Sequence, residues 1–432
     1  MTGLLPLPSY QFQPDPPSLW TMMRRGVSDF PGVVPASILE QPAVQLAGAR
    51  FGAPLVVADP ELIREVLYDR DERFTRDRLL RRMFRRAWGQ GLAGAEGESW
   101  QRQRRAAAPA FRPVAVADNG PAFVVAAAKA TKAWPCGEPV ELTQRVALIV
   151  ADIVFDVLVD SGGEVDTARV AADMHGYVKR IASWTLRDLL PLPESWHDRL
   201  SGVTGDPAVN RLRALARRIA QSRAGRCGKT DLIALLEGVG PVEDNIRGLF
   251  PAAMDTTVAG VSWTLYTLAL RPEWQQRVAD EARRCEGDFM AERLRLTRRV
   301  VQEALRLYPP AGFMIRSAAA DGRLGAFALH RGQPVLLAIY AMHRHRSLWD
   351  DPDEFDPDRF LPKRGTHSGW LPFGAGPRVC IAAQFALAEI TTVVARLLSE
   401  LEMAPAGAKP QLDLRATTRS ATGLTVVASA RA

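Results

Sequence analysis

The stretch that decides the fold reads Phe373-Gly-Ala-Gly-Pro-Arg-Val-Cys380-Ile-Ala382. It places one cysteine between a glycine-rich turn and the start of the last predicted helix. The partial positive charge and the free backbone amides at a helix N-terminus stabilise a thiolate. Gly374 and Gly376 let the backbone approach a flat ligand, and Phe373 is placed to pack beside the sulfur. The pattern favours a stabilised thiolate at Cys380, although a buried structural cysteine after a turn is the commoner arrangement when the cysteine is considered alone.

The other cysteines lack any comparable context. The chain has four in all, and none forms a Cys-x-x-Cys pair: Cys136, Cys227, Cys285 and Cys380. This spacing argues against a zinc site, and a cytosolic chain gives no reason to expect disulfides. We therefore expect the first three to be plain core or surface thiols.

Composition indicates an ordinary globular protein with a large buried core. The chain has 432 residues, of which 47% are hydrophobic and 24% charged. Its first twenty residues contain five prolines and lack both the apolar run of a membrane anchor and the pattern of a signal peptide. No later stretch is apolar for long enough to span a bilayer. We expect a cytoplasmic protein without a membrane span.

Basic residues gather in one part of the sequence, and the formal net charge is +7. Clustered arginines can bind a phosphate backbone, but no aromatic-interleaved groove or recognition helix accompanies these. We expect no nucleic-acid partner, and a solvated face or a dock for an acidic protein fits better. The cluster consists of Arg76, Arg78, Arg81, Arg82, Arg85 and Arg86, followed by Arg102, Arg104, Arg105 and Arg112.

Periodicity predicts a mainly helical chain with a minor sheet. The apolar residues 51–57 predict a strand, and Asp59-Pro60 then supplies an N-cap with proline at the first helical position. With no internal repeat or low-complexity linker, we expect one domain over residues 1–432, with a Pro-rich lead at 1–40. Residues 324–340 look strand-like with a turn at 330–332, and 350–362 look like coil. Helices are predicted over most of 120–236, with breaks at Pro135, 161–163 and 191–193, and over 244–270, 293–307 and 382–401.

The cysteine segment resembles the haem-binding loop of the cytochrome P450 family, Phe-x-x-Gly-x-Arg-x-Cys-x-Gly. Phe373, Gly376, Arg378 and Cys380 match in place, whereas Ala382 stands where the family has its last glycine. In the family the cysteine thiolate is the proximal iron ligand and favours O–O cleavage. The resemblance implies that Cys380 binds the metal of haem b (iron protoporphyrin IX). It also implies that Arg378 binds a haem propionate through charge-assisted hydrogen bonds.

A second motif is Glu303-Ala-Leu-Arg306, whose two charged residues share one helical face and can pair. It resembles the Glu-x-x-Arg helix end of the same family. Downstream, residues 355–360 resemble the Pro-Glu-Arg-Phe box, with Asp358 in place of the usual Glu. The resemblance implies that Glu303, Arg306 and Arg359 form a buried structural triad rather than a catalytic one.

A third motif, Ala252-Ala-Met-Asp255-Thr256-Thr257, lies inside the longest predicted helix. Adjacent Asp and Thr compete there for backbone hydrogen bonds, although a polar patch on a buried helix is a plain alternative. The segment resembles the oxygen-activation motif of the family, small-Gly-x-acid-Thr. The resemblance implies that the Thr256 hydroxyl donates to bound dioxygen and that Asp255 feeds protons from solvent.

Two residues of this helix depart from the family pattern. Ala253 stands where glycine is usual in the family, so its methyl group would crowd the space in which dioxygen binds. Pro251 lacks an amide hydrogen and clashes with the carbonyl of Arg247, so it should kink the helix. We hypothesise that Pro251 causes the local opening of the helix, which the glycine of the family pattern would otherwise make easier.

Two further motifs carry arginines. In Trp100-Gln-Arg-Gln-Arg104 a spacing of four puts both ends on one helical face, and the segment resembles the family's Trp-x-x-x-Arg helix. Arg316 matches a strand arginine of the family. The resemblance implies that Trp100, Arg104 and Arg316 bind the propionates, because each guanidinium fork can bind a carboxylate with two hydrogen bonds. Since the motifs follow the family order, we expect the P450 fold, with haem between the long central helix and the Cys-loop helix.

The resemblance implies a haem-thiolate monooxygenase of the soluble, bacterial kind. Such an enzyme inserts one oxygen atom of O2 into a hydrophobic small molecule by hydroxylation or epoxidation. No flavin-type segment or cysteine cluster remains outside the haem domain, so a separate ferredoxin and ferredoxin reductase would supply the electrons. Two alternatives stay open, a haem-thiolate peroxygenase using H2O2 and a non-catalytic haem-binding sensor. Neither would need the pair Asp255-Thr256.

The substrate is implied only as a class. The regions where the family contacts substrate are mostly apolar here, which suits a terpenoid, a fatty acid or an aromatic. The arginines between residues 78 and 92 could instead receive a carboxylate. The expected substrate contacts are Ala252, Phe313, Met314 and Leu424.

Overall fold

The computed structural model describes residues 5–15, 31–46, 53–69, 71–159, 165–181, 196, 206–223, 231–364 and 367–431. Within these ranges helices dominate and the strands are short, which confirms the mainly helical fold with a minor sheet. Part of the strand predicted at 51–57, the breaks predicted at 161–163 and 191–193, and Cys227 lie outside the described residues.

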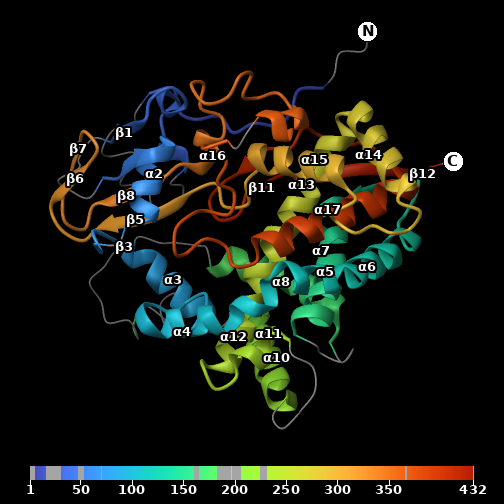
Figure 1. Ribbon diagram of the computed structural model, residues 1–432, viewed down its shortest axis with the longest axis horizontal. Helices are drawn as coiled ribbons and strands as arrows, with labels where there is room; N and C mark the ends of the chain where they lie inside the picture. Colours follow the sequence, from blue (N-terminus) through green and yellow to red (C-terminus); the bar gives the residue numbers. More distant parts are fainter. Residues whose placement is uncertain are drawn as a thin grey trace.

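The largest sheet is mixed and is assembled from strands far apart in the chain. Its order is β1 (Ala43–Gln45), β2 (Leu55–Val57), β8 (Pro334–Leu337), β5 (Met314–Ala318) and β3 (Phe74–Arg76). Strands β2 and β8 are parallel, and the other neighbours are antiparallel. In Figure 1 this sheet lies at the left, beside α2 (Pro60–Leu67), away from most of the helices.

Smaller antiparallel pairings complete the strands. One sheet has the order β4 (Pro139–Glu141), β12 (Thr425–Ala430) and β9 (Leu401–Pro405). Two hairpins are formed by β6 (Gly322–Leu324) with β7 (Phe327–Leu329) and by β10 (Leu412–Asp413) with β11 (Arg419–Ser420).

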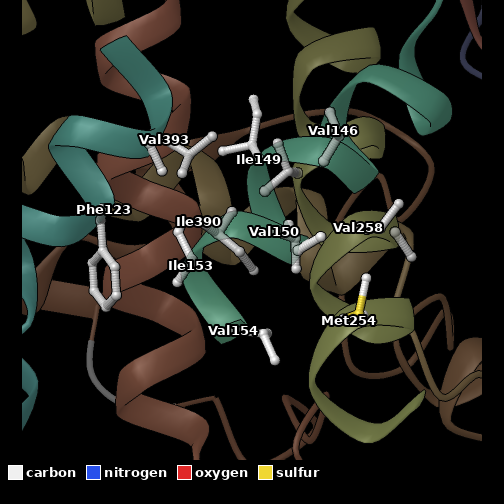
Figure 2. Close-up of a cluster of buried hydrophobic side chains, with 14 of the residues drawn as sticks. Phe123, Val146, Ile149, Val150, Ile153, Val154, Met254, Val258, Ile390 and Val393 are labelled. Carbon is white, nitrogen blue, oxygen red and sulfur yellow. The ribbon is translucent and has the colours of Figure 1, made fainter. Parts of the chain in front are cut away.

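The main hydrophobic core lies among packed helices. Figure 2 shows α7 (Leu142–Ile153) presenting Val146, Ile149, Val150 and Ile153 toward side chains of α17 (Ala383–Glu400) and α13 (Thr256–Ala269). These side chains are almost fully buried, as expected for apolar residues at helical spacing. The other helices are α3 (Arg78–Trp88), α4 (Gly97–Ala107), α5 (Pro113–Asp118), α6 (Gly120–Lys132), α8 (Thr167–Ile181), α10 (Pro207–Arg223), α11 (Leu232–Leu236), α14 (Pro272–Arg284) and α15 (Arg295–Leu307). Helix α16 (Ile339–Met342) packs instead in a second core with the large sheet.

The long central helix predicted at 244–270 is present, but it is widened in the middle. It consists of α12 (Val242–Leu249), a π-helical turn at Phe250–Asp255, and α13. Pro251 lies in the π turn and has no amide hydrogen to donate to the carbonyl of Arg247. An opening of the helix therefore occurs at the place where proline prevents the regular bond.

Most other expected elements are found with small shifts. The Asp59 carboxylate accepts from the amides of Glu61 and Leu62, both at 2.9 Å, and so caps α2 as predicted. The helices expected at 293–307 and 382–401 correspond to α15 and α17. The strand pattern expected through residue 340 is wrong at its end, because the chain leaves β8 and forms α16. No helix in the described part of the chain is long and apolar enough to cross a bilayer.

Glu303 and Arg306 form an ion pair within α15 that has no contact with solvent. Arg306 Nε lies 2.7 Å from Glu303 Oε2, and both side chains are 0% exposed. Arg306 also donates to the carbonyls of His343, Pro352 and Glu354, at 2.7, 2.7 and 3.0 Å. Because these acceptors belong to one irregular segment, the guanidinium fixes that segment against α15.

The same pair receives the Pro-Asp-Arg-Phe segment. Glu303 Oε1 accepts from the amide of Asp356 at 2.9 Å and lies 3.5 Å from Arg359 Nε. Arg359 in turn donates to the carbonyl of Asp351 at 2.9 Å. The structure thus brings the three residues of the expected triad together in the interior.

Two contacts pass from this network to the chain just before the cysteine loop. Burial, with the nearby charge of Arg306, lowers the pKa of His343 to about 3, so its ring is neutral. His343 Nε2 accepts from the Leu371 amide at 3.0 Å, so Nδ1 carries the proton and donates to the Arg306 carbonyl. Trp370 Nε1 donates to the carbonyl of Gln302 at 3.1 Å. The α15 network therefore holds the start of the cysteine loop.

Replacing Glu303 with glutamine should strongly destabilise the fold. The change leaves the Arg306 guanidinium buried without a counter-charge, which typically costs about 3–5 kcal/mol. The free energy of unfolding from urea titration measures the loss. The matched control is Asp288→Asn, which breaks the exposed pair with Arg293 and should cost no more than about 1 kcal/mol. Equal small losses for the two variants would contradict the dependence of the fold on Glu303.

Candidate active site

The cysteine loop is a tight turn that two glycines make possible. Gly374 and Gly376 have φ angles of 71° and 70°, which L side chains rarely adopt. A Cβ at Gly376 would also lie 2.1 Å from the Leu67 carbonyl oxygen of α2. The turn closes with the Cys380 amide donating to the Phe373 carbonyl at 3.0 Å. Ala382 has φ −95°, so alanine fits without strain where the family has glycine.

Cys380 is accessible from an internal cavity although it lies deep in the protein. Burial raises the pKa of the Cys380 thiol, while the backbone amide of Ala382 and the charge of Arg104 lower it. The stabilisation expected from the helix start is therefore present, but burial outweighs it in the protein alone. A bound metal cation reverses such a balance by stabilising the thiolate. The sulfur is better suited to ligating a metal than to acting as a free nucleophile.

The cavity has a volume of about 600 Å³, within the usual range for small-molecule and cofactor sites. Its wall includes Cys380 and Phe373 from the cysteine loop, Ala252 from the π-helical turn and Thr256, the first residue of α13. The wall is mostly apolar, with Leu80, Met83, Phe84 and Trp88 from α3, Leu232, Ile233 and Leu236 from α11, and Leu249 from α12.

Arginines line another part of this cavity. Arg104, Arg316 and Arg378, all expected from the sequence, are joined there by Arg76. Arg378 donates to the carbonyl of Ala95 at 3.1 Å, and its guanidinium lies 3.9 Å from the centre of the Trp100 ring. Burial, with the charge of Arg76, lowers the pKa of Arg316 to about 10 and that of Arg378 to about 9. Because these guanidinium groups are enclosed and lie near one another, a bound anion would stabilise their charged forms.

This donor set fits the group that the sequence implies. A haem carries two propionate carboxylates, and buried guanidinium groups bind carboxylates with strong, directional hydrogen bonds. Cys380 opens onto the same cavity and offers one sulfur ligand. Elsewhere in the described chain no group of three or more His, Cys, Asp or Glu side chains could hold a bare metal ion. The residues present therefore fit a haem bound through one thiolate and several arginines.

The solvated-face interpretation of the basic cluster is only partly correct. Arg78, Arg81, Arg85, Arg102, Arg105 and Arg112 are exposed. Arg82, in α3, is buried, and Arg76, at the end of β3, is largely enclosed. Both side chains lie on the face of their element that packs onto the rest of the protein. Sequence analysis did not assign Arg76 to the cavity. Its position there depends on strand pairing, which cannot be inferred from the local sequence.

Asp255 and Thr256 lie on the cavity wall, but both already have partners. The Thr256 hydroxyl donates to the carbonyl of Ala252 at 2.8 Å. The Asp255 carboxylate accepts from the Thr417 hydroxyl and forms an ion pair with Arg419. These partners come from the β10–β11 hairpin, some 160 residues away in the chain, so sequence spacing gave no signal for them.

Three of the four expected substrate contacts line the cavity: Ala252, Phe313 and Met314. Leu424 does not, and its side chain is 2% exposed and packs in the main core. Its carbonyl accepts from the Leu142 amide at 2.8 Å and its amide donates to Glu141 Oε1 at 3.2 Å, so it joins the start of β12 to α7. The C-terminal residues that reach the cavity are instead Arg415, Ala416 and Thr417.

Comparison with known proteins gives consistent matches. The family model described as Cytochrome P450 matches residues 53–214 and 241–424. "Cytokinin hydroxylase" of Arabidopsis thaliana is 28% identical over 381 residues, which is 81% of this chain and 73% of that protein. "Cytochrome P450 4A10" of Rattus norvegicus is 28% identical over 416 residues, covering 84% and 78%. A crystal structure of the cytochrome P450DA heme domain has a TM-score of 0.75 at 22% identity, covering 90% and 89%.

The matched family covers most of the chain, including the cysteine loop, the α15 network and the π-helical turn. The structural match independently gives the same fold. The family implies a haem cofactor, a redox partner and a hydrophobic substrate in general terms, which agrees with the thiol, the arginines and the apolar wall of the cavity. This chain belongs to the cytochrome P450 family and is a monooxygenase.

Proposed function

We propose that the chain binds haem b through Cys380 and hydroxylates or epoxidises a hydrophobic small molecule. We further propose that a separate ferredoxin and ferredoxin reductase supply its electrons. The observation that carries the proposal is the pair Asp255-Thr256, which lies on the wall of the cavity that also contains Cys380. A peroxygenase or a haem sensor needs no such pair. The single haem domain over residues 1–432 and the cytoplasmic location remain predictions.

The bound haem would supply the activation of dioxygen, and the protein would hold and orient it. Cys380 would provide the metal ligand, while Arg104, Arg316 and Arg378 would bind the propionates. Trp100 would keep Arg378 in place through the stacking contact at 3.9 Å. Phe373 lies beside the cysteine on the cavity wall, where it would shield the sulfur from water.

Proton supply would come from the π-helical turn. The Thr256 hydroxyl donates to the Ala252 carbonyl, so a small rotation about its side chain would redirect that hydrogen toward the cavity. Asp255 would pass protons to this hydroxyl from the side of the β10–β11 hairpin, where it meets Arg419. The opening at Pro251 would leave backbone carbonyls free to hold water between the two groups.

The apolar wall supports a hydrophobic substrate. Phe313 and Met314 at the start of β5 and the apolar face of α3 would bind the substrate and exclude water. One relative is named a cytokinin hydroxylase, which supports hydroxylation as the reaction type. The arginines of the cavity are better placed for the propionates than for a substrate carboxylate.

Thr256→Val should separate the monooxygenase from its alternatives. Removing a positioned proton donor should lower product formation with O2, ferredoxin and reductase by roughly 10²-fold, while peroxide-driven turnover persists. Product and consumed NAD(P)H are measured together. Thr264→Val is the matched control, since Thr264 makes the same helical bond to Gly260 at 2.7 Å but lies outside the cavity.

Two results would overturn this assignment. Equal activity of wild type and Thr256→Val with the redox partners, alongside efficient use of peroxide, would favour the peroxygenase. No turnover by either route across a broad panel of apolar compounds, with haem bound, would favour the sensor.

Pro251→Ala should increase the release of peroxide relative to product. An alanine can donate to the Arg247 carbonyl, so the π-helical turn should revert toward a regular helix and displace Thr256. Hydrogen peroxide and product are quantified per NAD(P)H consumed. Pro272→Ala serves as the control. It also removes a proline, but from the first turn of α14, where the helix is regular. Unchanged coupling in Pro251→Ala would show that the opening does not depend on the proline.

An exposed basic surface on α4 and the start of α5 is the proposed docking site for an acidic ferredoxin. Arg102, Arg105 and Arg112 are exposed there, while Arg104 of the same helix faces the cavity. Val114, 73% exposed, offers an apolar contact beside these charges. Helix α4 therefore connects the surface to the cofactor cavity within one turn.

Arg105→Glu should slow reduction by ferredoxin and flatten the dependence of its rate on salt, because the charge reversal repels an acidic partner. Stopped-flow reduction at several ionic strengths measures both effects. The control Arg218→Glu makes the same charge change on the exposed face of α10 and should leave the rate unaltered. A rate for Arg105→Glu equal to that of wild type would exclude docking at this surface.

A further inference from the structure

Two buried nitrogen donors belong to residues of the cavity wall and have no hydrogen-bond partner in the described part of the chain. They are Nε1 of Trp88, at the end of α3, and Nδ2 of Asn245, in the first turn of α12. A buried donor without a partner costs free energy, so each such group in a native structure needs an explanation. A ligand in the cavity can supply the missing acceptor.

The two donors lie at one corner of the cavity. Asn245 and Gly248 are three residues apart in α12 and therefore share a helical face. Gly248 packs directly against Trp88, because a Cβ added to the glycine would lie 3.3 Å from the Trp88 Cβ. The Leu92 amide donates to Asn245 Oδ1 at 2.7 Å, and Leu92 lines the same cavity. That bond occupies the carboxamide oxygen and leaves the NH2 end for a ligand.

The indole of Trp88 is held by an aromatic neighbour. Its ring stacks on that of Phe84, with the ring centres 4.2 Å apart and the planes 23° from parallel. Both residues line the cavity. A stacked indole presents a large apolar surface together with one polar N–H group. The corner therefore suits an apolar molecule that carries an acceptor atom.

The charged residues of α12 beside this corner are already paired. Arg247 lies 2.8 Å from Asp244, and the Asp244 carboxylate also accepts from the amide of Gln90 at 2.8 Å. Neither an indole nor a carboxamide carries a charge. An ionised carboxylate would lose its hydration at these two donors without gaining a counter-charge from them, whereas a carbonyl oxygen needs only hydrogen bonds.

We propose that Trp88 Nε1 and Asn245 Nδ2 bind an uncharged carbonyl oxygen of the substrate. The substrate class is then an apolar skeleton that carries a ketone, and neither a plain hydrocarbon nor a carboxylic acid. The proposal rests on the proposed function and deepens it, because an anchored oxygen fixes how the skeleton lies in the cavity. Trp88 and Asn245 are positioning residues that determine specificity, since a site with buried donors rejects an analogue that leaves them unpaired.

A permanently bound water molecule would satisfy the same donors without any role in specificity. In that case a ketone and the hydrocarbon of the same skeleton should bind equally well. If the donors bind the substrate, the ketone should bind more tightly and lose this advantage when a donor is removed. The ratio of the two affinities therefore separates the two roles.

The test measures dissociation constants of haem-loaded protein for matched ketones and hydrocarbons by calorimetric titration. The pairs are fluorenone with fluorene, tetralone with tetralin, and cyclododecanone with cyclododecane. We expect wild type to bind at least one ketone about tenfold more tightly than its hydrocarbon. Trp88→Phe keeps a stacked ring without the N–H group, and Asn245→Asp keeps an acceptor for the Leu92 amide without the NH2 group. Each change should reduce the preference to about threefold or less and leave the affinity for the hydrocarbon unaltered.

Trp134→Phe is the matched control. Trp134 Nε1 is also buried without a hydrogen-bond partner in the described chain, but Trp134 does not line the cavity. Its replacement should leave the ketone preference at the wild-type value.

Three results would overturn the proposal. They are equal affinities within every pair in wild type, a ketone preference that survives both Trp88→Phe and Asn245→Asp, and tighter binding of fluorenecarboxylate than of fluorenone. A wild type that prefers the ketone but oxidises none of these ligands would support the anchor and contradict the proposed reaction.

Discussion

The buried pair of Glu303 and Arg306 is the interaction on which the site depends. Arg306 has no contact with solvent, so its charge is tolerated only with Glu303 beside it and with carbonyls filling its remaining donors. Those carbonyls belong to the irregular segment that leads to the cysteine loop. Through the neutral His343 ring the network reaches Leu371, two residues before Phe373. The position of Cys380 is therefore fixed from α15 rather than from the loop alone.

The cavity combines apolar walls with concentrated positive charge. The apolar part can hold a hydrophobic molecule, while the arginines of β3, α4, β5 and the cysteine loop can hold carboxylates. Because burial and mutual repulsion lower the pKa of Arg316 and of Arg378, these guanidinium groups gain more from an anionic ligand than exposed ones would. Binding of haem and stability of the surrounding strands should thus be coupled.

The π-helical turn of the central helix forms another part of the cavity wall. A π-helical turn that contains Pro251 interrupts the regular helix at the place where Ala252 and Thr256 line the wall. Asp255 is tied to Thr417 and Arg419, while the adjacent Arg415 and Ala416 also line the cavity. The acid of the π-helical turn is therefore connected to a hairpin that a bound substrate can touch.

The sequence by itself determined the helical fold, the long central helix, the cysteine loop and the Glu303–Arg306 pair, because each depends on residues close together in the chain. Tertiary structure alone decided which C-terminal residues reach the cavity. Leu424 became a core residue, and Thr417 and Arg419 became partners of Asp255. It also decided the place of Arg76, which looks like part of a surface cluster until strand register sets it opposite Arg316. Local spacing carries no information on which strand pairs with which, and that pairing is settled by packing of the whole chain.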